Sequence, residues 1–380
     1  MKRSGWLEIT SVETQGEPTL AKACTEALTQ TGRVERLTHG FHTYPAGLHP
    51  DTVRVLLELC PGETVLDPFC GGGTTLVEGL AAGREVIGTD LSPIAVLVAQ
   101  GRSRLWDEPT ISRMRGAARR ITETAKTWKD LPRDPAVLAV RSWYEEHVGR
   151  ELEGLRRGIE LAPEELQGAL WVCFSSILVK CSLRRSDTSA QRVQKHRAAE
   201  TTAILFHKKA REYGRRLEAL RKACPSGARA AVMESDCREN RLGNQTVDAI
   251  VTSPPYPGVY DYLPLQRLRL AWLGHDDERR EAEVGPRRAF KADRHKALAT
   301  WRADMRAWLT TAHAQLNSGG RVAIVIGDGF SGRRTLDSLA PMLSAADQAG
   351  LRPLARASGF RVDEGPGVKR GEHVLLFEKP

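Results

Sequence analysis

The sequence predicts an α/β fold, a Rossmann-like sheet with a helical insertion, on three observations. Residues 63–90 follow the order strand, glycine-rich turn, helix, strand and acid, which is half of a Rossmann unit. Residues 230–236, 247–251 and 319–327 return to short apolar strand patterns. Residues 105–227, between the two groups of strands, show only helical spacing of their apolar residues.

The 380 residues are enough for one large α/β domain and a second module. We expect an N-terminal extension over residues 1–39, an α/β domain built from residues 40–104 and 228–380, and a helical insertion over residues 105–227. In the extension the sequence indicates a loop at residues 14–18 and one short helix at residues 20–28.

The composition is that of a protein from a reducing compartment. Seven cysteines are scattered without a CxxC pair or metal-ligand spacing, so we expect neither disulfide bonds nor a zinc site. The N-terminus is polar and mixed in charge, unlike a signal peptide. The longest apolar run, within residues 166–179, is shorter than the ~20 residues of a membrane span. We therefore expect a cytoplasmic protein without a membrane contact.

A turn with an aromatic residue and a proline, Tyr44-Pro45, stands just before an expected helix over residues 51–59 with Asp51 as its N-cap. Such a turn can line a ligand pocket. The alternative is a linker packed against the core, and the spacing favours neither.

A glycine-rich turn follows the first strand of the sheet, at Gly71-Gly72-Gly73. Because glycine has no Cβ, the backbone can approach a ligand closely here. The helix expected over residues 75–82 offers free N–H groups to an anion. No Lys-Ser/Thr pair follows the glycines, which disfavours a nucleoside-triphosphate loop.

Acids end two of the expected strands. Asp90 follows the strand at residues 84–90, where a carboxylate can accept from the vicinal hydroxyls of a ribose. The alternative for Asp90 is a cap for the helix at residues 94–100. Asp236 ends the strand at residues 230–236, and its alternative is a turn-forming Asp ahead of Cys237.

The strand at residues 247–251 runs into Ser253-Pro254-Pro255-Tyr256, where neither helix nor strand can continue because proline lacks a backbone donor. A hydroxyl, a free backbone carbonyl and an aromatic ring then stand at the edge of the sheet. Such a set suits a planar amine, whose hydrogens the oxygens accept while the ring stacks on its face. The alternative is an ordinary strand followed by a Pro-rich turn.

The remaining chain alternates helix and strand. Tyr260, Asp261 and Tyr262 bring two rings and an acid near the Ser253 turn. We expect a helix in which Arg267 and Arg269 face phosphate, and then a charged loop that closes over a substrate. The expected elements are the helix at 265–273, the loop at 276–294, a strand at 319–327, a helix at 336–349, and an antiparallel pair at 352–360 and 373–377.

The insertion is expected to hold helices at residues 118–128, 138–155, 163–183 and 201–222. From Lys180 to Lys222 it carries thirteen Lys and Arg residues against four acids, a net charge of +9 that equals the charge of the whole chain. Charge confined to one segment is typical of a phosphate-binding face, and the alternative is a solvated helical surface. The candidates for nucleic-acid contact are Arg184, Arg185, Lys208, Lys209, Arg215 and Arg216.

Two motifs resemble those of DNA amino-methyltransferases, in the order in which the cofactor half precedes the catalytic half. Asp67-Pro-Phe-Cys-Gly-x-Gly-Thr resembles their S-adenosylmethionine loop, with Gly72 where Ser is common, and Ser253-Pro-Pro-Tyr resembles their catalytic signature. The resemblance covers roughly residues 40–104 and 228–380 and includes the Tyr44-Pro-Ala turn. It implies the class I methyltransferase sheet and S-adenosylmethionine as cofactor. The cofactor-binding residues that it implies are Tyr44, Pro45, Asp67, Pro68, Phe69, Cys70, Gly71, Gly73, Thr74, Asp90, Leu91 and Asp236, the last accepting from the adenine amino group.

The resemblance also implies methylation of an exocyclic amino group of a DNA base, as in restriction–modification, by chemistry that needs no metal. Ser253, Pro254, Pro255 and Tyr256 would be catalytic: the Ser253 hydroxyl and the Pro254 carbonyl accept from the amine, and Tyr256 stacks on a base flipped from duplex DNA or held in single-stranded DNA. Ser at the first motif position favours cytosine N4, and adenine N6 is the alternative. The insertion would serve as the target-recognition region.

Three rival functions stay open. An RNA amino-methyltransferase can share both motifs, although the N-terminal extension offers only about forty residues, fewer than the RNA-binding domain that such enzymes carry ahead of the cofactor loop. A small-molecule or protein amine methyltransferase leaves the basic segment unexplained. A nucleic-acid-binding protein without catalysis is disfavoured by the intact Asp67, Gly71, Gly73 and Ser253.

Overall fold

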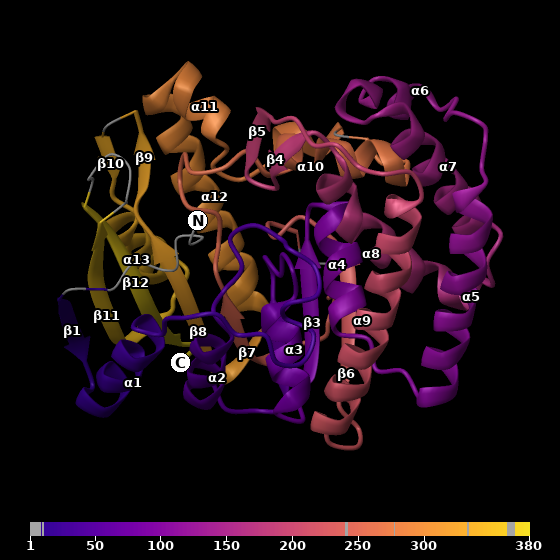
Figure 1. Ribbon diagram of the computed structural model, residues 1–380. Coiled ribbons are helices and arrows are strands. Elements are labelled where there is room, and N and C mark those ends of the chain that lie inside the picture. The colour runs from indigo at the N-terminus through magenta and orange to yellow at the C-terminus, as the bar shows by residue number, and fades with distance from the viewer. Residues whose placement is uncertain (1–8, 10, 240–241, 277, 333, 363–368) are drawn as a thin grey trace.

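The computed structural model describes residue 9 and residues 11–239, 242–276, 278–332, 334–362 and 369–380. Within this part of the chain, eight strands form one twisted sheet in the order β1-β11-β12-β8-β7-β2-β3-β6 (Figure 1). The strands are β1 Val12–Gly16, β2 Thr64–Asp67, β3 Glu85–Asp90, β6 Arg229–Glu234, β7 Val247–Thr252, β8 Leu316–Gly327, β11 Arg352–Val362 and β12 Lys369–Glu378.

The topology confirms the predicted Rossmann-like sheet. Strands β6, β3, β2, β7 and β8 are parallel, and numbering these five along the chain gives the order 3-2-1-4-5 of a Rossmann sheet. β12 lies antiparallel between β8 and β11, which confirms the predicted closing pair. β1, which the sequence did not indicate, adds to the outer edge of β11.

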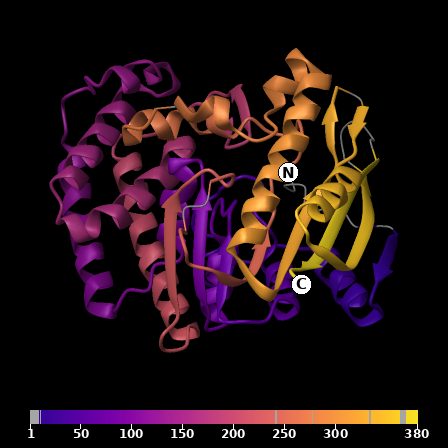
Figure 2. The same cartoon turned by 180° about the vertical axis from the view of Figure 1, so that it is seen from behind.

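Both faces of the sheet are covered by helices, so the inner strands β2 and β3 carry buried apolar residues on both sides. Val65 and Val86 face one layer, while the alternating residues Leu66 and Ile87 face the other. The first layer holds α1 Pro18–Leu28, α2 Pro50–Leu59 and α3 Thr74–Ala81, and the second holds α12 Arg294–Gln315 and α13 Leu339–Gln348. Figure 2, seen from behind, brings the second layer to the front.

The insertion packs around a core of its own beside β3 and β6, the edge of the sheet opposite β1 (Figure 1). After α4 Pro93–Arg102 it forms α5 Glu108–Lys126, α6 Pro135–Leu138, a 3-10 turn η1 Arg141–Trp143, α7 Glu146–Glu160, α8 Glu164–Cys181 and α9 Thr201–Ala223. Its core side chains include Met114, Leu152, Phe174 and Phe206. Trp272, from α10 Tyr262–Leu273 of the α/β domain, joins this core and connects the two parts.

Several predicted helix bounds in the insertion are wrong. The helix expected at residues 138–155 is α6, η1 and α7, because the chain turns at Tyr144, whose ring packs edge-on against Trp272. α5 begins ten residues before position 118, because the Asp107 side chain accepts from Thr110 N. A short hairpin, β4 Arg184–Ser186 and β5 Ser189–Arg192, stands where the sequence indicated only charge.

Two predictions for residues outside the insertion are also wrong. α2 begins at Pro50 with His49 as its N-cap, so Asp51 lies in the first turn. The charged stretch expected as a loop over residues 276–294 forms the 3-10 turn η2 Glu278–Ala282 and the helix α11 Arg287–Ala292, with residue 277 outside the described residues. A small ribbon of β9 Gly329–Ser331 and β10 Arg334–Leu336 lies near α11 (Figure 1).

Candidate active site

The candidate site lies at the carboxyl ends of β2 and β7. These neighbours in the sheet are the strands at which the strand order reverses, and ligands of open α/β sheets bind at such a point. The Thr252 hydroxyl at the end of β7 donates to Asp67 Oδ1 at the end of β2, at 2.6 Å. This hydrogen bond holds the glycine-rich turn and the Ser253 turn side by side.

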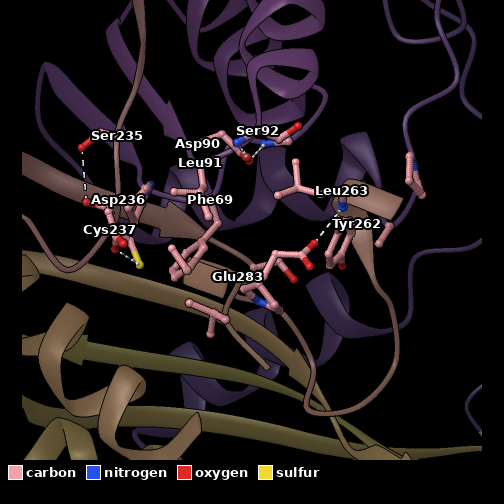
Figure 3. A pocket seen from close by; sticks show the side chains of 18 of the residues that line it. Phe69, Asp90, Leu91, Ser92, Ser235, Asp236, Cys237, Tyr262, Leu263 and Glu283 are labelled. Carbon is pink, nitrogen blue, oxygen red and sulfur yellow. Dashed lines mark hydrogen bonds between the residues drawn. The ribbon is translucent and has the colours of Figure 1, made fainter. Parts of the chain in front are cut away.

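A cleft of about 740 Å³, its open mouth included, runs across these two turns (Figure 3). Phe69 lies at its middle, with Asp90 and Ser92 on one side, Asp236 and Cys237 on another, and Tyr262 and Glu283 facing them. The lining residues are Tyr44, Pro45, Ala46, Pro68, Phe69, Gly71, Asp90, Leu91, Ser92, Ser235, Asp236, Cys237, Ser253, Pro255, Tyr262, Leu263, Ala282, Glu283 and Val284.

Asp90 is held in place by backbone donors. Its Oδ2 accepts from Gly71 N and its Oδ1 from Ser92 N, each at 2.9 Å. Each carboxylate oxygen keeps room for a further donor from the cleft. Burial raises the pKa of Asp90 from its ordinary 3.8 to about 6, against the effect of the two N–H donors. Ser92, and not Asp90, is the N-cap of α4, with Ala95 N donating to its hydroxyl.

Part of the predicted cofactor loop lies behind the cleft wall. Asp67 is 3% exposed and accepts from Phe69 N as well as from Thr252, and burial raises its pKa to about 6. Cys70, Gly73 and Thr74 are also buried behind the lining residues. Gly73 has φ of 77°, and a Cβ there would lie 3.0 Å from the Ala99 Cα, so the turn requires glycine.

Asp236 stands at the far end of the cleft with a fixed partner. Arg238 donates through its side chain to both carboxylate oxygens, and its backbone N–H donates to Oδ1 at 2.9 Å. Burial alone would raise the pKa of Asp236, but these bonds bring it below its ordinary value. Arg238 also donates to Asp304 Oδ1 at 2.7 Å and to the Ala282 carbonyl at 2.8 Å, so it joins α12 and η2 to the cleft wall.

The Ser253 turn presents two unused oxygens. Among the residues that the structure describes, none is hydrogen-bonded to the Ser253 hydroxyl or to the Pro254 carbonyl. The turn is anchored one residue later, where the buried Trp301 donates Nε1–H to the Pro255 carbonyl at 3.1 Å. A polar side chain and a free carbonyl are thus fixed beside the cleft without being used by the fold.

Tyr256 lies outside the cleft lining. Its hydroxyl donates to Glu372 Oε1 of β12 at 2.9 Å, and its ring covers Gly327 at the end of β8, where a Cβ would come within 2.5 Å of the ring. The ring therefore stands on the side of the Ser253 turn that faces β8 and β12.

The wall of the cleft formed by residues 262–263 and 282–284 was not predicted from the sequence, except for Tyr262. Glu283 follows η2 and accepts from Leu263 N, the start of α10, at 2.8 Å, while it pairs with Arg288. Burial raises the pKa of Glu283. The charged run at residues 276–294 carried no signal that separates this one acid from its neighbours, because only the tertiary fold turns it inward.

The six basic candidates do not form one surface. Arg184 is 4% exposed and donates to the Leu265 and Ser189 carbonyls, and Lys209 is 8% exposed and donates to the Phe41 carbonyl and Glu212. Arg216 donates to Glu212 and the Glu35 carbonyl. Arg185, Lys208 and Arg215 are exposed.

The expectation that Arg269 faces phosphate is wrong, since it is 2% exposed and pairs with Asp187. Arg267 is exposed. Among the described residues, no helix is long and apolar enough to cross a membrane, and no group of three or more His, Cys, Asp or Glu residues is placed to hold a metal ion.

Comparison with known proteins finds similarity to DNA methyltransferases. Residues 29–100 match the N6/N4 methyltransferase family model, described as DNA methylase. The Type II methyltransferase M.MvaI of Kocuria varians is 37% identical over 84 residues, which are 21% of this chain and 18% of that protein. The Type II methyltransferase M.BsoBI of Geobacillus stearothermophilus is 25% identical over 281 residues, which are 63% of this chain and 53% of that protein.

The chain thus spans about half the length of the second relative and less than a fifth of the first. The solved rRNA methyltransferase aviRa from Streptomyces viridochromogenes aligns over 93% of this chain and 92% of its own, with a TM-score of 0.33 and 13% identity, a likeness too slight to say anything of the substrate. These matches make the chain similar to the DNA amino-methyltransferases, and they support S-adenosylmethionine as its cofactor.

Proposed function

We propose that the protein transfers a methyl group from S-adenosylmethionine to the exocyclic amino group of a DNA base, with cytosine N4 as the favoured position. The observation that carries the proposal is the pair of unused oxygens, the Ser253 hydroxyl and the Pro254 carbonyl, beside a cleft with acids along its walls. The family match supports the same chemistry.

The lining of the cleft fits the cofactor. Phe69 and Leu91 offer apolar surface to a purine ring, and the free lone pairs of Asp90 suit the two ribose hydroxyls. Asp236 would accept from the adenine amino group, and Tyr44 and Pro45, which line the cleft beside Gly71, would enclose the methionine part. Four buried residues of the loop would not contact the cofactor but would fix the conformation of the glycine-rich turn: Asp67, Cys70, Gly73 and Thr74. When bound, the cofactor supplies an electrophilic methyl group on its sulfonium.

The Ser253 turn would prepare the amine. An exocyclic amine is a weak nucleophile because its lone pair is delocalised into the ring. Two hydrogen bonds, to the Ser253 hydroxyl and the Pro254 carbonyl, hold the amine with its lone pair toward the cleft, and Pro255 fixes the turn through Trp301. Holding both reactants in line supplies much of the acceleration. The amine becomes acidic only once it is methylated, so no strong base is needed before transfer.

Tyr256 would hold the target base. A base inside a duplex cannot reach the cleft, so it must be flipped out or presented in single-stranded DNA, and a ring beside the Ser253 turn can stack on it. We also propose that residues 105–227 form the DNA-recognition region, with Arg185, Lys208 and Arg215 as the exposed members of its basic set.

The test uses purified protein with methyl-labelled S-adenosylmethionine, and it offers duplex DNA, single-stranded DNA and total RNA in parallel. Digestion to nucleosides and mass analysis identify the modified base. N4-methylcytosine in DNA supports the proposal, and N6-methyladenine keeps the class and corrects the base. Label in RNA alone, or in no nucleic acid despite cofactor binding, overturns the proposal.

A further inference from the structure

We propose that the β4–β5 hairpin, residues 184–192, reads the DNA sequence by entering the major groove, with Arg185 and Gln191 contacting base edges. The inference rests on the proposed function, since it names the element that selects the DNA site. It also separates this hairpin from the rest of the basic segment of residues 180–222.

The hairpin is fixed to the helix that walls the cleft. The buried Arg184 donates to the Leu265 carbonyl of α10 at 2.6 Å, and the buried Arg269 of α10 pairs with Asp187 in the turn of the hairpin. α10 begins at Tyr262 and Leu263, which line the cleft. A rigid connection therefore runs from the hairpin to the candidate active site, with one helix between them.

The hairpin and the cleft lie at the same end of the molecule. Figures 1 and 2 both place β4, β5 and α10 beyond the carboxyl ends of the parallel strands, where the cleft also opens. DNA that delivers a base to the Ser253 turn would thus pass the hairpin. β5, the second strand of the hairpin, is also held by η1, because Arg192 donates to the Ser142 carbonyl at 2.8 Å.

The outer face of the hairpin carries side chains suited to bases. Arg184 points inward and Arg185 outward, as alternation along a strand requires. Arg185 Nη1 donates to Gln191 Oε1 across the two strands at 2.6 Å, so both side chains stand on one exposed face. Arg pairs with guanine and Gln with adenine through two hydrogen bonds each, and the major groove admits a two-stranded ribbon.

The basic residues of the last turn of α9 are placed differently. Arg221 and Lys222 are exposed on its last turn, and the chain enters β6 at Arg229 a few residues later. Because β6 is parallel to β3 and β2, its start lies at the end of the sheet away from the cleft. These two residues therefore provide a matched control that removes more positive charge than the hairpin variant does.

The experiment compares Arg185→Ala/Gln191→Ala with Arg221→Ala/Lys222→Ala. Both variants and the wild type methylate phage DNA, and the modified positions are mapped by single-molecule sequencing. Thermal melting and binding of S-adenosylhomocysteine show that each variant is folded. We expect the hairpin variant to lose about tenfold or more in rate at the wild-type sites and to relax one or two base positions. The α9 variant keeps the wild-type sites and rate.

The outcomes separate the two proposals. If the wild type modifies no DNA, the proposed function fails and the hairpin inference fails with it. If the wild type modifies defined sites and the hairpin variant modifies the same sites at the same rate, only the hairpin inference is overturned. If the hairpin variant loses all methylation, Arg185→Lys decides. A changed base preference supports base reading, and an unchanged preference with a uniformly lower rate overturns it.

Discussion

In the proposed mechanism the Ser253 hydroxyl and the Pro254 carbonyl both accept from the amine, and the hydroxyl can be removed without disturbing the fold because no described residue bonds to it. For Ser253→Ala we expect unchanged affinity for S-adenosylhomocysteine and a loss of about 100-fold in turnover, since the amine loses one of its two positioning bonds. Isothermal titration and single-turnover methylation measure the two quantities. A parallel loss of cofactor affinity would contradict this division of roles.

The Tyr256 ring and its hydroxyl have separable roles. The hydroxyl binds Glu372, whereas the ring is the part that can stack on a base. We expect Tyr256→Ala to lower kcat/KM for DNA by roughly 5- to 150-fold, the range of one base–aromatic stack, and Tyr256→Phe to lower it much less. The ratio of the two variants in steady-state methylation tests this. Equal losses would assign the effect to the Glu372 bond.

Burial of Asp67 makes stability depend on pH. The pKa of Asp67 in the folded protein, about 6, exceeds the ordinary 3.8. The carboxyl group therefore contributes its full share to the free energy of unfolding below pH 4, and this share is lost as pH rises through 6. Relative to Asp67→Asn, which does not titrate, the wild type should lose about 2 kcal/mol of unfolding free energy between pH 4.5 and 7.5. Urea unfolding at both pH values measures the difference. Parallel profiles for the two proteins would show that the carboxyl titrates normally.

At the scale of elements, α9 depends on one buried acid of α7. Glu151 is 4% exposed and accepts from Glu200 N and Ala203 N at 2.8 and 2.9 Å, where α9 begins without a cap from its own N-cap side chain. Glu151→Ala leaves these donors unpaired and should lower the unfolding free energy by about 1–3 kcal/mol. Urea unfolding measures this loss. Glu151→Gln keeps one acceptor oxygen, so we expect it to lower the free energy of unfolding less than Glu151→Ala does. A loss of the same size in both variants would point to the charge alone.

The elements that carry motifs are those the sequence predicted well. Strands β2, β3, β7 and β8 each contain a run of apolar residues. This local pattern is enough to predict where they lie in the sequence. The turns after β2 and β7 were predicted as the cofactor loop and the catalytic turn, and in the structure residues of both line one cleft. β1 and the β4–β5 hairpin were missed because they hold few apolar residues and are fixed by partners far away in the chain, β11 and α10.

The direction in which each charged side chain points could not be predicted from the sequence. Arg184, Lys209 and Arg216 belong to the charge run, yet each is turned toward carbonyl groups or acids that lie in other elements. Charge counting cannot separate a cation that ties loops together from one that faces solvent. The same limit hid Glu283, one acid among many in its stretch of chain.

At the scale of the whole molecule, the insertion has a core of its own, and Trp272 is the largest side chain of the α/β domain that joins it. The hairpin and the cleft are joined through α10, so Trp272 supports both. We expect Trp272→Ala to cost about 3–5 kcal/mol of stability in the insertion. Hydrogen exchange would show the loss in α7 and α8 before it appears in β2 and β7. Uniform loss across both parts would show a single cooperative unit.

The place of β12 in the sheet has a consequence for how the chain folds. β12 is the last described strand along the chain, yet it lies between β8 and β11, and β1 can pair only with β11, as Val12 does with Gly359. During synthesis β1 must wait until β11 has emerged, and pairings between strands so far apart in the sequence form slowly. Until then the edge of β8 is open. A nascent chain stalled before residue 369 should therefore bind chaperones, although the turns after β2 and β7 have already been made.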